Sequence, residues 1–114
     1  MASSQPERRQ PRDAIEICRP ITLQLLGDAG EALSPWLPAD ILNVSVGGLC
    51  LLISEDPALD LRQGMPLRLD VTSQPSFGQA QISGQLRWCL RSGLVVTLGL
   101  VFNEPLPALP ELES

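Results

Sequence analysis

Apolar and polar residues alternate along several stretches of the chain, which is the period-2 pattern of strands that bury one face. The alternation is clearest over residues 15–25, 66–71 and 79–90, and two further apolar runs occupy residues 49–53 and 94–102. Turns containing Gly and Pro separate these stretches, and none of them has the period of a long amphipathic helix. The pattern therefore predicts an all-β domain, folded as an antiparallel barrel or sandwich.

Some positions qualify this prediction of the strands. Pro20 falls inside the first alternating stretch, and because proline has no N–H to donate, we expect an edge strand or a bulge there. The polar residues 54–63 predict a loop with room for one helical turn. Trp88 continues the even-numbered apolar positions of residues 79–90, so we expect its side chain to pack in the core.

The two ends of the chain differ from the middle. Residues 1–13 are polar, charged and interrupted by Pro, and they predict a flexible arm in front of a barrel domain over residues 14–103. Residues 104–114 form a Pro-rich tail. Three Pro within residues 103–110 argue against a long terminal helix.

Composition is that of one globular domain. The 114 residues are 44% hydrophobic and 18% charged, and no apolar run approaches the ~20 residues of a membrane span. The first residues lack the apolar centre of a signal peptide, so we expect a cytoplasmic protein without membrane insertion. Cys18, Cys50 and Cys89 lie in apolar runs without metal-site spacing and are expected to be buried thiols.

The types of charged residue and their distribution along the chain limit the functions that the protein can have. Every basic residue is Arg, and the absence of His removes the usual general base and metal ligand, which argues against an enzyme. Residues 1–12 carry three Arg against Glu7, whereas the rest of the chain carries five Arg against twelve acids, for a net charge of −5. A single basic arm on an acidic body disfavours long nucleic acids and favours a small anionic ligand held by a few guanidiniums.

Two polar motifs carry candidate chemistry. The arm contains Arg8-Arg9-Gln10-Pro11-Arg12, and each guanidinium can bond O6 and N7 of guanine, or two phosphate oxygens, at once. The second motif, Asn43-Val44-Ser45-Val46-Gly47-Gly48, lies between two apolar runs. Its short side chains offer donors and acceptors to a guanine edge, and we expect its glycines to permit positive φ and close approach of a ligand.

Together these motifs resemble the RxxxR and (D/N)xSxxG pair of the PilZ family, and Gly99-Leu100-Val101-Phe102 resembles a Gly-x-x-Phe that closes many PilZ domains. The resemblance covers nearly the whole chain. It implies a six-stranded split barrel that binds the bacterial second messenger cyclic di-GMP, without a metal or cofactor. The ligand-binding residues that it implies are Arg8, Arg9, Arg12, Asn43, Ser45, Gly47 and Gly48.

The expected function is therefore that of a non-enzymatic receptor. Its arm closes over cyclic di-GMP, and the newly ordered surface passes the signal to an unidentified effector protein. One alternative is a nucleotide-independent protein-binding adaptor on the same fold, although the Arg motif counts against it. The other is an OB-like barrel for single-stranded nucleic acid, which needs a basic groove with aromatic platforms, whereas this chain has a pI near 4.5 and 4% aromatic residues.

Overall fold

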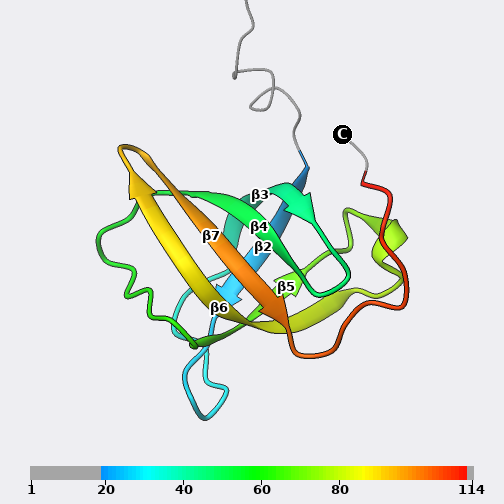
Figure 1. The fold of residues 1–114 in the computed structure, drawn as a ribbon. Helices are drawn as coiled ribbons and strands as arrows, with labels where there is room; N and C mark the ends of the chain where they lie inside the picture. The colour runs from blue at the N-terminus through cyan, green and yellow to red at the C-terminus, as the bar shows by residue number, and fades with distance from the viewer. Residues whose placement is uncertain (1–18, 113–114) are drawn as a thin grey trace, which may run out of the picture.

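The computed structural model describes residues 19–112 and contains a closed antiparallel β-barrel (Figure 1). Around the barrel the strands follow the order β2-β3-β4-β7-β6-β5, and β6 and β7 form a long hairpin. The predicted all-β, six-stranded barrel is confirmed. Its elements are β2 (Pro20–Leu25), β3 (Leu37–Val44), β4 (Gly48–Ser54), β5 (Pro66–Asp70), the short 3-10 helix η2 (Pro75–Phe77), β6 (Gln81–Ser92) and β7 (Val95–Phe102).

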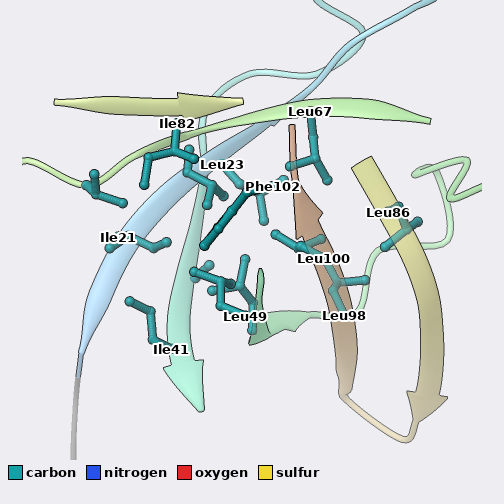
Figure 2. Close-up of a cluster of buried hydrophobic side chains, with 14 of the residues drawn as sticks. Ile21, Leu23, Ile41, Leu49, Leu67, Ile82, Leu86, Leu98, Leu100 and Phe102 are labelled. Atoms are coloured by element: carbon teal, nitrogen blue, oxygen red, sulfur yellow. The ribbon is translucent and has the colours of Figure 1, made fainter. Parts of the chain in front are cut away.

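The core fills the inside of the barrel with one face of every strand (Figure 2). Leu23, Leu51 and Leu98 are fully buried, and they come from three different strands. The alternating pattern therefore located the buried face, and each Leu or Ile in it contributes about 1.5–3 kcal/mol on leaving water. The same alternation leaves the outer face of the sheet for other uses.

The edge strand or bulge expected at Pro20 is not found. The barrel is closed, so β2 has neighbours on both sides, and Pro20 is its first residue. Pro20 pairs only with Asp40 of β3, because the pairing with β5 begins at Thr22. A proline at a strand's first position removes no internal ladder bond, which is why the closed barrel accepts it.

The loop after β4 also differs from its prediction. Beyond Ser54, which ends β4, residues 55–63 contain turns but no helical turn. The guanidinium of Arg91 crosses this loop, forming an ion pair with Glu55 and donating to the carbonyl of Leu59 at 3.2 Å. Residues 103–112 are likewise non-helical, as their Pro content predicted. Within residues 19–112 there is no helix of the length and apolarity needed to cross a membrane.

Candidate functional site

A row of four residues crosses the outer face of the barrel, one from each of four adjacent strands. Asn43 of β3 lies opposite Cys50 of β4, Cys50 lies opposite Gly99 of β7, and Gly99 lies opposite Trp88 of β6. With adjacent strands about 4.8 Å apart, the row spans roughly 14 Å. Residues far apart in the chain therefore meet on one surface.

Trp88 reaches this surface because β6 contains a one-residue irregularity. Leu86 lies opposite Leu100, but the next register pair is Trp88 with Gly99, so Arg87 is an extra residue on β6. An extra residue reverses the alternation beyond it, and Trp88 turns outward with 47% of its surface exposed. The prediction that Trp88 packs in the core is wrong for this reason.

A second irregularity turns Asn43 outward on the other side of the row. Ile41 lies opposite Leu51 and Asn43 lies opposite Cys50, which leaves Leu42 as the extra residue of β3. In a regular strand Asn43, two residues after the buried Ile41, would also face the core. The Asn43 side chain is instead exposed, and its carboxamide group forms no hydrogen bond within residues 19–112.

Gly99 forms the seat on which the indole of Trp88 lies. A Cβ atom added at Gly99 would overlap Cε2 and Nε1 of the indole and would lie 2.8 Å from Cδ1. Gly99 is itself buried, since the ring covers it. The Gly of the Gly-x-x-Phe motif thus lets the ring lie against β7, and its Phe102 is a buried core residue.

The turn between β3 and β4 is organised by the hydroxyl of Ser45. Ser45 Oγ accepts from the N–H groups of Gly47 and Gly48, at 3.3 and 3.2 Å, and donates to the carbonyl of Gly48 at 3.2 Å. The backbone N–H of Ser45 donates to the same carbonyl at 2.8 Å. A hydroxyl has one donor and two acceptor positions, so Ser45 is fully used in shaping the turn. A direct bond from Ser45 to a ligand stays a prediction.

The two glycines of the turn do not have the conformation expected of them. The positive-φ glycines of the structure are Gly30, Gly64, Gly78 and Gly93, so neither Gly47 nor Gly48 adopts positive φ.

Gly48 is required instead by a close approach between strands. An added Cβ would overlap the carbonyl oxygen of Leu100 and would lie 3.2 Å from Cα of Val101. At Gly47 an added Cβ would meet nothing within 4 Å, so that position stays open to solvent.

The row and the turn surround an open cleft of about 340 Å³. Arg87 is the one charged residue in its lining, and its exposed guanidinium has no ion pair or hydrogen bond within the described residues. Three other clefts, near Glu31, Glu104 and Asp70, each have one more carboxylate than guanidinium in their lining. The cleft at the row is therefore suited to an anion, although the other three are larger, at about 430, 420 and 370 Å³.

Comparison with known families agrees with this geometry. A family model described as the PilZ domain matches residues 6–111. The chain belongs to the PilZ domain family. The matched range contains both polar motifs and the row, and PilZ domains are generally receptors for cyclic di-GMP rather than enzymes. A search of curated proteins finds no match.

The PilZ motifs are only partly within the described residues. Asn43, Ser45, Gly47 and Gly48 all line the cleft, so the structure brings this half of the predicted site together. Arg8, Arg9 and Arg12 lie outside residues 19–112, as does Cys18.

Sequence reasoning missed two residues of the PilZ cleft and misplaced two thiols. Arg87 and Trp88 line the cleft, and a shift of one residue in β6, which strict alternation does not foresee, brings them there. Cys50 is half-buried in the floor of the cleft and Cys89 is exposed, so the expectation of buried thiols is wrong for both. Cys89 lies opposite Leu98 in the last part of β6, where every residue from Arg87 to Ser92 is exposed.

Proposed function

We propose that this PilZ domain is a cytoplasmic, non-enzymatic receptor for cyclic di-GMP, which binds over the row on the outer face of the barrel. The observation that carries the proposal is the combination of an exposed indole, an unpaired guanidinium and a free amide around one cleft. These are Trp88, Arg87 and Asn43, and no carboxylate lines the cleft.

Each of the three groups suits a different part of the nucleotide. The face of Trp88 offers a stacking surface for a base, and base–aromatic stacking is worth about 1–3 kcal/mol. The guanidinium of Arg87 can bond two phosphate oxygens, or O6 and N7 of guanine. Asn43 can both donate to and accept from a base edge, and as a neutral residue it does not repel a dianion.

The N-terminal arm supplies the remaining contacts in this proposal. The carbonyl of Arg19 accepts a hydrogen bond from the N–H of Ile41 in β3 at 3.1 Å, so the chain leaves the barrel beside the strand that carries Asn43. At about 3.3 Å per extended residue, Arg12 can reach up to ~23 Å from Arg19 and Arg8 up to ~36 Å. Both reaches exceed the ~14 Å span of the row.

The contacts must also offset the cost of ordering the arm. A micromolar Kd corresponds to about −8 kcal/mol, and fixing the backbone costs about 1–2 kcal/mol per residue, so binding requires the cleft and the arm to contribute contacts together. Closure of the arm would then present a new surface to an effector protein. Ligand shifts that equilibrium only as far as it prefers the closed arm.

Calorimetric titration with cyclic di-GMP and cyclic di-AMP tests the proposal. Both ligands carry two phosphates, but adenine has an amino group where guanine has O6, so only the guanine ligand is expected to bind tightly. Trp88→Ala should weaken binding, and Trp36→Ala is the control because Trp36 packs beside Arg68 on the opposite side of the barrel. Equal affinity for both ligands would reduce the site to a charge trap. Absence of binding by either would favour the nucleotide-independent adaptor.

A further inference from the structure

The C-terminal residues 103–112, here called the C-terminal strap, run from the end of β7 beside the turn between β3 and β4 (Figure 1). The N–H of Leu106 donates to the carbonyl of Val46 in that turn at 2.7 Å. Just before the strap, the N–H of Phe102 donates to the carbonyl of Gly47 at 2.9 Å. Two consecutive carbonyls of the ligand-binding turn are thus held from outside the turn.

These two bonds fix the direction of the amides that face the cleft. In a trans peptide the C=O and the following N–H point in opposite directions. Because the carbonyls of Val46 and Gly47 point to the C-terminal segment, the N–H groups of Gly47 and Gly48 point toward Ser45 Oγ, and all three residues line the cleft.

The strap is itself firmly attached to the barrel. Leu106 is only 6% exposed and belongs to the core cluster, and Pro110 is buried. At the far end, the hydroxyl of Ser76 in η2 donates to the carbonyl of Glu111 at 2.7 Å. Pro107 restricts Leu106 to an extended backbone, and Pro105 fixes its own φ directly before Leu106, so less entropy is lost when the Leu106 N–H is placed.

We propose that the C-terminal strap holds the Ser45–Gly48 turn in its ligand-binding shape, with Leu106 as the positioning residue. This inference rests on the proposed function of the cleft. Ligand affinity then depends on a segment that does not line the cleft, and by thermodynamic reciprocity an occupied cleft holds the strap more tightly. The strap is accordingly a second element, besides the arm, through which occupancy changes the surface of the molecule.

The test compares two proline substitutions within the same segment of the full chain. Leu106→Pro removes the N–H that bonds to Val46 and keeps an apolar side chain and an extended backbone. Leu109→Pro is the matched control, because Leu109 is 61% exposed and makes no hydrogen bond within the described residues. We expect Leu106→Pro to weaken cyclic di-GMP binding about 2- to 10-fold, the value of one net hydrogen bond, and Leu109→Pro to leave it unchanged.

Loss of general stability must be separated from loss of turn geometry. Val71→Ala, at a fully buried residue outside the cleft, lowers stability without touching the turn and should leave the Kd unchanged well below Tm. Leu106→Ala keeps the N–H and loses buried surface, so it should lower Tm and affect binding less than Leu106→Pro. If Leu106→Pro fails to fold, the comparison of Leu106→Ala with Val71→Ala decides, since the strap proposal requires only the former to weaken binding.

Hydrogen exchange of the ligand-free protein gives a readout that does not depend on the nucleotide. The amides of Gly47 and Gly48 should exchange faster in Leu106→Pro than in the wild type or in Leu109→Pro. If the wild type binds cyclic di-GMP but Leu106→Pro binds equally well with unchanged exchange, the strap proposal is overturned and the proposed function stands. If the wild type does not bind, the proposed function is overturned, and the exchange rates alone decide whether the strap holds the turn.

Discussion

The packing of the Trp88 indole against Gly99 predicts the effect of the substitution Gly99→Ala. An alanine Cβ would overlap two atoms of the indole and lie 2.8 Å from a third, whereas carbon atoms in contact are ordinarily 3.5–4.0 Å apart. The ring must therefore lift from β7 by about 1 Å or swing away. Because the ring is the outer surface of the protein at this point, the barrel need not deform to accommodate the change.

The structure sets the size of the effect on stability and on binding. About half of the Trp88 surface is buried, on the order of 100 Å², so complete undocking would cost no more than about 2.5 kcal/mol. For a domain of this size, that is a fall in Tm of at most about 10 °C. Loss of a stacked base costs about 1–3 kcal/mol, so affinity for cyclic di-GMP should fall about 5- to 150-fold.

Scanning calorimetry and titration calorimetry measure the two quantities, and a double-mutant cycle with Trp88→Ala isolates the cause. Once the ring is absent, Gly99→Ala has nothing to displace, so it should have no further effect on affinity in the Trp88→Ala background. An equal loss of affinity in both backgrounds would show that the substitution acts through the strands and not through the ring. An unchanged affinity for Gly99→Ala alone would refute the stacking role of Trp88.

Three further predictions follow from other parts of the molecule. Arg12→Ala should weaken cyclic di-GMP binding by about 1–3 kcal/mol in a calorimetric titration while the Tm of the free protein stays unchanged, and a fall in Tm without a loss of affinity would make its role structural. Gly48→Ala should lower Tm by about 4–12 °C, because overpacking against β7 costs about 1–3 kcal/mol. Gly47→Ala is the control and should leave Tm unchanged, because an added Cβ there meets nothing within 4 Å. Similar Tm values for the two variants would contradict the close approach of Gly48 to β7. Hydrogen bonds from the side chain and backbone of Thr72 lower the pKa of Asp70. This contact therefore stabilises the fold above the ordinary carboxyl pKa, and the stabilisation is lost on acidification. Thr72→Val should raise the Asp70 titration midpoint measured by NMR, and an unchanged midpoint would exclude the side-chain hydrogen bond as a cause of the shift.

The all-β fold was predictable because alternate residues of each strand face the core, and the apolar residues occupy those alternate positions. Leu67, Leu69 and Val71 are all buried as their spacing predicts, and the same holds for Ile21, Leu23 and Leu25. The closure of the barrel was harder to predict from the sequence, because contacts between distant segments decide which strands pair. Pro20 illustrates this limit: its missing donor suggested an edge, but the ladder of β2 simply begins at that residue.

The candidate site was predictable only where it is made by local sequence. The turn from Ser45 to Gly48 is a contiguous motif, and its bonds are formed within four residues. Trp88 was assigned to the wrong face because one inserted residue in β6 reverses every later position, and no feature of residues 79–90 marks the insertion. The reason for Gly48 was likewise invisible, because the carbonyl of Leu100 that it accommodates comes from β7.

One measurement tests the central claim most directly: a titration of the full chain with cyclic di-GMP followed by ¹H–¹⁵N NMR. The two indole N–H signals are the decisive pair, because Trp88 lines the cleft and Trp36 lies against Arg68 on the opposite side of the barrel. We predict saturable shifts of the Trp88 indole and of the Asn43 and Gly47 amides, while the Trp36 indole stays in place. Shifts at Trp36 with none at Trp88, or no shifts at saturating ligand, would contradict a cyclic di-GMP site on this face.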